Sequence, residues 1–158
     1  SSASRTVFGH GLLFVNTGYS KAQLLAIRPD GTGDVTSSHV VWKQVRGASN
    51  KPSPVLIGDY LFMITDSGGI LSCVEAKSGN VVWQERIGGS QSSSLLYAQG
   101  HIYTFGEDGR TVVFKPGDVF AKVAENRLDG GFMASPAVSG KSLYLRSKTH
   151  LYRIEVSK

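Results

Sequence analysis

A repeat of about 41 residues is the feature of this sequence that most limits the folds open to it. A glycine followed by an apolar and aromatic run occurs four times, at residues 9–15, 58–64, 100–105 and 140–146. The aromatic residues of these runs are separated by 48, 41 and 41 residues, and they are Phe14, Phe62, Tyr103 and Tyr144. Trp42 and Trp83 are also 41 residues apart. A fixed period of this length indicates tandem structural units that pack against their neighbours.

Each unit is expected to be a small antiparallel sheet. In the second unit the expected strands are residues 53–57, 60–65, 70–75 and 80–86. The turns between them are rich in glycine, aspartate, asparagine and serine, which favour hairpins. Four short antiparallel strands repeated every ~40–45 residues are typical of a β-propeller, in which each sheet is one blade. The sequence therefore predicts an all-β fold of about four blades, the last one incomplete.

The units divide a single domain of 158 residues, with expected bounds of about 5–47, 48–89, 90–130 and 131–158. The first unit is longer because of a segment rich in turn-forming residues at 28–39, which we interpret as a loop insertion. In the third unit Ala124 stands where the first two have tryptophan, so a weaker contact between sheets is expected there. The fourth unit lacks a fourth strand, and its three expected strands are residues 133–138, 142–147 and 150–156.

The repeated aromatic residues are expected to hold the blades together. One blade cannot bury both of its faces, so neighbouring blades must stack. A tryptophan on the outer strand can fill the gap between two sheets, and burying it contributes roughly 2–3 kcal/mol. The expected structural repeat residues are therefore Phe14, Phe62, Tyr103, Tyr144, Trp42, Trp83 and the turn residue Gly79.

Charge and composition exclude several classes of protein. The net charge is +5, but the basic residues are scattered rather than gathered beside aromatic platforms, so no nucleic-acid partner is expected. No apolar run approaches the ~20 residues of a transmembrane helix, so no membrane span is expected. Residues 1–5 contain no apolar core of a signal peptide. Cys73 is the single cysteine, which excludes an internal disulfide, and we expect it to be a small buried apolar residue.

Residues 73–83, CVEAKSGNVVW, resemble the repeat of the pyrroloquinoline quinone (PQQ) β-propeller family. That repeat reads roughly Leu-x-Ala-x-x-Thr/Ser-Gly-x-x-x-Trp, and the matching residues here are Val74, Ala76, Ser78, Gly79 and Trp83. Residues 53–71 resemble the beginning of the same repeat, with a Ser-Pro pair, a glycine turn and an Asp-x-Gly sequence. The resemblance extends over nearly the whole chain. It implies a bacterial PQQ-like protein of the non-enzymatic type, located in the periplasm or outside the cell, and a ring of seven or eight blades.

The resemblance does not by itself imply catalysis. Enzymes of this family hold the quinone and a Ca²⁺ ion with carboxylate and asparagine ligands, and they stack the cofactor on a tryptophan and a disulfide between adjacent cysteines. This chain has one cysteine, so that disulfide is impossible, and no acidic set can be assigned to a metal. We therefore expect no catalytic residue, no cofactor-binding residue and no metal ligand, and no cofactor.

The histidines and the aspartates of the long loop do not form a recognisable metal site. None of the histidines pair at metal-ligand spacing; they are His10, His39, His101 and His150. Asp30 and Asp34 flank two glycines but lack the further acidic ligands of a calcium loop. A turn or an insertion is the favoured interpretation of that loop.

Other conspicuous residues also favour structural roles. The serine run at 88–96 lacks the Gly-x-Ser-x-Gly sequence of a nucleophile elbow, and Gly9 and Gly11 do not form a dinucleotide fingerprint. Phe132 and Met133 precede the innermost strand of the fourth unit, where blade packing is favoured over the lining of a central channel. The acidic residues of possible interest belong to different units, and they are Glu75, Glu107, Asp108 and Glu125.

The leading hypothesis is a non-catalytic propeller domain that acts as a binding or scaffolding module for protein or polysaccharide. One alternative is a part of a PQQ- and Ca²⁺-dependent dehydrogenase. Another is a structural half-propeller that assembles with itself, so that a homodimer completes the ring. An open ring exposes strand edges and apolar faces, which favour association.

Overall fold

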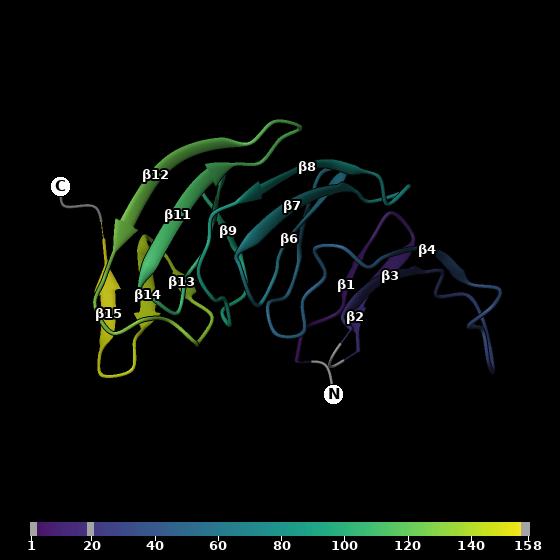
Figure 1. The fold of residues 1–158 in the computed structure, drawn as a ribbon, viewed down its shortest axis with the longest axis horizontal. Coiled ribbons are helices and arrows are strands. Elements are labelled where there is room, and N and C mark those ends of the chain that lie inside the picture. Colours follow the sequence, from purple (N-terminus) through teal and green to yellow (C-terminus); the bar gives the residue numbers. More distant parts are fainter. Residues whose placement is uncertain (1–2, 19–20, 156–158) are drawn as a thin grey trace.

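The computed structural model describes residues 3–18 and 21–155 of the chain. These residues form strands and turns and no helix, which confirms the all-β prediction. The strands make three four-stranded sheets and one three-stranded sheet, and every pair of neighbouring strands is antiparallel. Figure 1 shows the sheets side by side in chain order. Each sheet is one blade, and we number the blades 1 to 4 from the N-terminus.

The strands of each blade follow one another in space as they do in the chain. Blade 1 consists of β1 (Val7–Gly9), β2 (Leu12–Thr17), β3 (Gln23–Ile27) and β4 (Val40–Gln44). Blade 2 consists of β5 (Val55–Ile57), β6 (Tyr60–Ile64), β7 (Ile70–Glu75) and β8 (Val81–Arg86). Blade 3 consists of β9 (Leu96–Ala98), β10 (His101–Tyr103), β11 (Arg110–Lys115) and β12 (Ala121–Arg127). Blade 4 consists of β13 (Ala137–Ser139), β14 (Ser142–Arg146) and β15 (Leu151–Ile154).

The innermost strands are shorter than the sequence predicts. Residues 53–57 and 133–138 were expected to be strands, but the observed strands begin only at Val55 and Ala137. Pro54 and Pro136 have no N–H to donate to a neighbouring strand. The N–H of Ser53, just before Pro54, donates to Ser94 Oγ of the next blade instead of to its own sheet. The chain therefore joins the sheet only after the proline.

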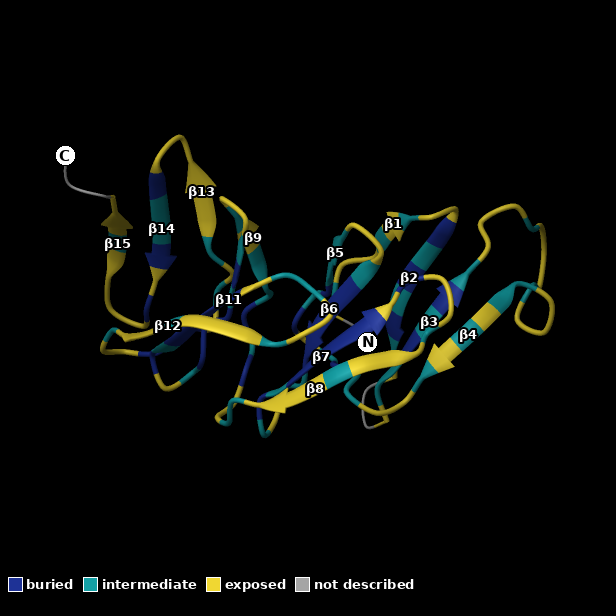
Figure 2. Cartoon of the chain, turned by 90° about the horizontal axis from the view of Figure 1, so that it is seen from above, coloured by how far each residue is buried: buried dark blue, intermediate teal, exposed yellow. Residues whose placement is uncertain are grey.

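The outermost strands of blades 2 and 3 are exposed along most of their length, as the yellow ribbons of β8 and β12 in Figure 2 show. Each outer strand contains a β-bulge that skips one valine: Val41, Val82 and Val123. These valines face solvent, with 50%, 38% and 51% of their surface exposed. The bulge shifts the register by one residue, so the following residue points to the other face of the blade.

The apolar core lies between the blades rather than within them. One cluster joins Phe14 and Leu24 of blade 1 to Leu61 and Val74 of blade 2. A second joins blade 2 to blade 3 through residues that include Phe62 and Phe114. The third, between blades 3 and 4, contains only three fully buried members: Phe105, Phe132 and Leu145. We call these three contacts the first, second and third joints.

The insertion of the first unit is a loop, whereas the stretch of helical composition is a strand. Between β3 and β4, the N–H groups of Ser38 and His39 both donate to the carbonyl oxygen of Val35, and no strand forms in this insertion. The stretch at 121–128, the one of helical composition, forms strand β12 over Ala121–Arg127, as its place in the repeat predicts. Within the described ranges, the structure has no helix that is long and apolar enough to cross a membrane.

Candidate functional site

The four repeated aromatic residues occupy equivalent positions in the blades. Each lies on the second strand and pairs with the first residue of the innermost strand, in the pairs Phe14–Val7, Phe62–Val55, Tyr103–Leu96 and Tyr144–Ala137. Phe14 and Phe62 are fully buried. Tyr103 and Tyr144 are only partly buried. The aromatic packing is therefore tightest in the first two joints.

Each tryptophan reaches out of its own blade into the next one. The indole N–H of Trp42 donates to the carbonyl oxygen of Ala76 at 3.0 Å, and that of Trp83 donates to Gly117 at 3.0 Å. Ala76 and Gly117 lie at the start of the turn between the third and fourth strands of blades 2 and 3. The Trp42 ring packs 5.8 Å from the ring of Phe14 in the first joint. The joints are thus closed by apolar packing and by one directed hydrogen bond.

Gly79 serves the first joint from within the same turn. Its φ of +76° lies in the left-handed region that glycine adopts readily. A Cβ atom at this position would lie 2.7 Å from the Trp42 ring. The glycine of the repeat therefore allows the turn and also leaves room for the tryptophan of the preceding blade.

The third joint has no indole. On β12 the residue paired with Val113 beside the bulge is Ala124, in the position that Trp83 holds opposite Cys73 in blade 2. A cleft of about 520 Å³ opens between blades 3 and 4. Its walls include Tyr103 and Phe105 of blade 3 and Leu143 of blade 4.

A chain of hydrogen bonds links the starts of the innermost strands. The N–H of Arg5 donates to Ser53 Oγ at 2.8 Å, the N–H of Ser53 to Ser94 Oγ at 3.0 Å, and the N–H of Ser94 to Ser135 Oγ at 3.0 Å. The sequence reasoning missed this ladder. The 41-residue spacing of the three serines, the same as that of the aromatic residues, was the signal that could have revealed it.

A charged contact crosses from blade 2 to blade 3 beside the serine ladder. The Lys51 ammonium lies 2.7 Å from Ser92 Oγ and 3.4 Å from Glu107 Oε1, and Ser92 also donates to Glu107. The hydrogen bond from Ser92, followed by the Lys51 ammonium, holds the pKa of Glu107 below its ordinary value against the opposing effect of partial burial. Glu107 is therefore ionised at neutral pH and anchors the lysine.

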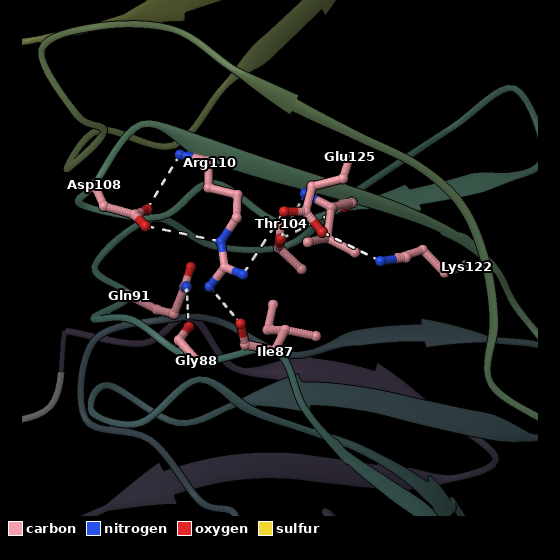
Figure 3. A network of polar contacts seen from close by, with 9 residues as sticks. Ile87, Gly88, Gln91, Thr104, Asp108, Arg110, Lys122 and Glu125 are labelled. Atoms are coloured by element: carbon pink, nitrogen blue, oxygen red, sulfur yellow. Dashed lines mark hydrogen bonds and ion pairs between the residues drawn. The ribbon is translucent and has the colours of Figure 1, made fainter.

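Arg110 forms a second polar contact across the same joint, shown in Figure 3. Its guanidinium donates to the carbonyl oxygen of Ile87, in the connection that leads out of blade 2. Its nitrogens also lie 3.7 Å from Asp108 and 3.8 Å from Glu125. The side chain is only 26% exposed, so the arginine ties the connection to blade 3.

The acidic residues noted in the sequence do not converge on one point. Asp108 and Glu125 share Arg110, whereas Glu107 pairs with Lys51. Glu75 accepts a hydrogen bond from Ser78 in its own turn. Within residues 3–18 and 21–155, no group of three or more histidine, cysteine, aspartate or glutamate side chains is arranged to hold a metal ion.

His10 reaches from blade 1 to blade 2, whereas the other histidines and the long-loop aspartates make local contacts. His10 Nε2 lies 2.9 Å from the carbonyl oxygen of Gly58, and His39 lies 3.4 Å from Asp30. His101 contacts the carbonyl oxygen of Gln99 in its own turn, and His150 stacks beside Tyr152. Asp34 accepts the N–H of Thr36, which is an ordinary turn contact.

Residues 132, 133 and 73 have clearly different environments. Phe132 is buried and packs edge-on against Phe105, with ring centroids 5.8 Å apart, so it belongs to the third joint. Met133 exposes 59% of its surface. Cys73 is fully buried, and burial raises the pKa of its thiol to about 12. The cysteine packs as an apolar residue.

Comparison with known proteins identifies the family. A family model described as the outer membrane protein assembly factor BamB matches residues 1–85, which is more than half of the chain. The chain belongs to the BamB family of PQQ-like β-propellers. No curated protein matches the sequence at a significant level. The family match confirms the resemblance drawn from the sequence and agrees with the tryptophan-closed joints of blades 1 to 3.

Solved structures share the fold of this BamB-family chain. BamB from Moraxella catarrhalis matches with a TM-score of 0.68 and 22% identity, over 92% of this chain and 43% of that chain. Myxococcus xanthus glutaminyl cyclase matches with a TM-score of 0.60 and 18% identity, over 97% of this chain and 65% of that chain.

A europium-containing methanol dehydrogenase also matches, with a TM-score of 0.60 and 12% identity, over 77% of this chain and 24% of that chain. The BamB-family chain therefore spans less than two thirds of each of these proteins. At these identities the likeness shows the fold alone, and that fold is a partial β-propeller. The same architecture thus occurs in an assembly factor and in enzymes.

Proposed function

We propose that this BamB-family chain is a non-catalytic β-propeller segment that binds protein partners during the assembly of outer membrane proteins, in the periplasm of a bacterium. The observation that carries the proposal is the match of residues 1–85 to the family of an outer membrane protein assembly factor. The joints support it physically, because interlocked blades form a rigid platform on which exposed loops keep fixed positions.

The binding surface that we propose is the end of the blades at which the serine ladder lies. Lys51, Ser92 and Met133 hold equivalent positions in the three connections between blades, 41 residues apart. Met133 offers an exposed apolar side chain, and Lys51 is 46% exposed beside Glu107. Exposed methionine and a flanking ion pair suit a protein partner, since interfaces favour apolar anchors with a polar surround.

The test is direct binding of purified outer membrane protein assembly machinery to the immobilised 158-residue chain, measured by biolayer interferometry. We expect saturable binding that Met133→Asp weakens about tenfold. Val119→Asp is the matched control, because Val119 is 70% exposed but lies in the β11–β12 turn at the other end of blade 3. Absence of binding, or equal loss in both variants, would contradict the proposal.

The enzymatic alternative has its own test. The chain is incubated with PQQ and Ca²⁺, and reduction of a redox dye is followed with alcohol or sugar substrates. We expect no dye reduction and no change in the absorbance of PQQ. Substrate-dependent dye reduction would replace the binding hypothesis by a quinoprotein dehydrogenase.

Self-assembly is a second candidate because blade 1 has an apolar outer face. Phe8, Leu13, Ile27 and Val40 form one row across all four strands, and Phe8 is 63% exposed. A second copy of the chain that covers this face would complete a ring. Sedimentation velocity decides the matter: a mass of 16.9 kDa at all concentrations would exclude the homodimer.

A polysaccharide partner is tested by adding peptidoglycan fragments to the interferometry experiment.

A further inference from the structure

The cleft in the third joint has the size of a ligand site. Its volume of about 520 Å³ falls inside the range of roughly 300–1,000 Å³ that is usual for pockets that bind small molecules. Both walls are largely apolar, and the contributing residues include Leu96, Tyr103, Phe105, Val138, Leu143 and Leu145. Polar and charged side chains also line the cleft, among them Asn126, Arg127, Lys141 and Glu155. Apolar walls with a small number of polar groups are typical of sites that bind and orient a ligand.

Strand register shows what kind of group the cleft would accept. In the second joint the Trp83 ring lies 6.0 Å from Phe62 and 6.1 Å from Phe114. The equivalent of Phe62 in blade 3 is Tyr103, because both pair with the first residue of the innermost strand. In blade 3, Ile102 on the second strand pairs with Phe114. In blade 4 the second-strand residue 41 positions later, Leu143, pairs with Ile154, so Ile154 is the equivalent of Phe114. Tyr103 and Ile154 both line the cleft.

The described chain places no ring between these two residues. The position that would supply one is Ala124, which lies in the same row as the cleft residues Tyr103 and Val113. An indole therefore fills the first and second joints. The third joint has lining residues at the equivalent strand positions, but no indole lies between them. The cleft therefore presents, at the register of the two indole sites, lining residues that no indole of the described chain contacts.

We propose that this cleft binds an aromatic side chain, best a tryptophan, presented by a protein partner. In the other joints the indole N–H donates to an oxygen of the next blade. The Glu155 carboxylate lines the cleft; its Oε1 accepts hydrogen bonds from Ser142 and Arg153, which leaves Oε2 as an acceptor for such an N–H. This inference deepens the proposed binding function. It rests on that function in one respect, namely that the molecule carrying the ring is a protein. The site is separate from the surface around Met133.

The first experiment uses free indole as the probe and the complete chain as the target. Leucine methyl groups are followed by NMR during a titration. We expect saturable shifts at Leu96, Leu143 and Leu145, because an apolar pocket of defined shape binds a matching ring. Ala124→Trp should place an indole in the cleft from within the chain and weaken indole binding at least tenfold. Val123→Trp is the matched control, since residue 123 is exposed in the bulge, and it should bind indole as the natural chain does.

A second experiment tests the protein carrier. An extended peptide with a central tryptophan should bind with the same methyl shifts and be displaced by indole, and the peptide with alanine in its place should bind at least tenfold more weakly. The proposal is wrong if indole gives no saturable shift in the cleft, or if Ala124→Trp binds it unchanged. It is also wrong if the chain associates with itself and Ala124→Trp abolishes that association, because a second copy would then be the occupant.

Folding of the variants is checked by circular dichroism. If Ala124→Trp does not fold, Leu143→Phe is used instead, because the larger side chain reduces the volume of the cleft from the blade 4 wall. The proposal then requires that Leu143→Phe weaken indole binding. Failure of indole binding leaves the interaction with the assembly machinery through Met133 unaffected, so the two proposals fail separately.

Discussion

The indole N–H of Trp42 lies 3.0 Å from the carbonyl oxygen of Ala76, across the boundary between blades 1 and 2. The same contact recurs 41 residues later between Trp83 and Gly117. In blade 2, the turn between the third and fourth strands accepts the hydrogen bond from the tryptophan of blade 1, and the strand that follows this turn carries Trp83. One copy of this short motif therefore supplies the acceptor of one joint and the indole of the next.

Removal of the second indole should destabilise the protein strongly. Trp83→Ala is expected to lower the free energy of unfolding by roughly 2–4 kcal/mol, slightly below the usual range for a buried tryptophan because the residue is only partly buried. Trp83→Phe keeps a ring but leaves the Gly117 carbonyl with only the weak thiol donor of Cys73, so a loss of about 1 kcal/mol is expected. Urea denaturation followed by circular dichroism measures both. A loss below 0.5 kcal/mol (a rough threshold) in Trp83→Ala would show that the indole does not stabilise the joint.

A methyl group at Gly79 should cost more than one at Gly58. Both glycines have positive φ, +76° and +57°, so alanine is strained at either position by about 1 kcal/mol. At Gly79 the new Cβ would also meet the Trp42 ring, whereas nothing lies within 4 Å at Gly58. We expect Gly79→Ala to lose about 1–2 kcal/mol more than Gly58→Ala. Equal melting temperatures of the two variants would contradict this account of the glycine.

The serine ladder can be tested at its middle member. Ser94→Ala removes the acceptor for the N–H of Ser53, and the expected loss of stability is about 1 kcal/mol. Ser139→Ala, at an exposed serine in blade 4, is the control and should be neutral. Thermal unfolding measures the difference. Identical stability of the two variants would mean that water replaces the ladder without cost.

The thiol of Cys73 should be unreactive in the folded protein. Burial, followed by the charge of Asp118, raises its pKa to about 12, and only the thiolate reacts with disulfide reagents. At pH 8 we expect modification by Ellman's reagent to proceed at the rate of unfolding. The raised pKa also means that this group favours the folded state below its ordinary pKa of 9.0, an effect lost as the pH rises toward 12. Rapid stoichiometric labelling of the native chain would show that the residue is accessible.

The contact of Glu107 with Ser92 and Lys51 should depend on pH. Because the folded-state pKa is lowered from 4.5, the contact contributes stability above that pH, and the contribution disappears as the pH falls through the lowered pKa. Glu107→Gln is expected to be about 1 kcal/mol less stable than the natural chain at pH 7, and the difference should shrink as the pH falls below 4.5. Unfolding curves at pH 7 and at lower pH measure this. A difference that stays constant with pH would point to lost packing rather than lost charge.

Local patterns in the chain were sufficient to predict the blades. The glycine-aromatic runs and the polar turns define strands that differ from the observed ones by one or two residues in most cases, because hairpin formation depends on neighbouring residues. The errors lie at the innermost strands. There the N–H of Ser53 is used by a serine of another blade, and no pattern within one unit reveals that partner.

The candidate sites divide in the same way. That Asp108 and Glu125 meet at Arg110 while Glu107 turns to Lys51 could not be predicted, because the residues belong to different strands and their distances depend on how blades 2 and 3 stack. The open third joint was foreseen only as a weaker contact at Ala124. Its volume and its lining by Tyr103 and Ile154 required the positions of both blades.

The amino-acid sequence alone determined the repeat, the all-β architecture and the family, because the 41-residue period and the residues of each turn are local properties of the chain. The tertiary structure decided which serine, lysine and tryptophan reach across each joint and where a joint stays open. Those contacts join groups of residues 34 to 56 positions apart in the chain, and only the stacking of neighbouring sheets brings them within hydrogen-bond distance.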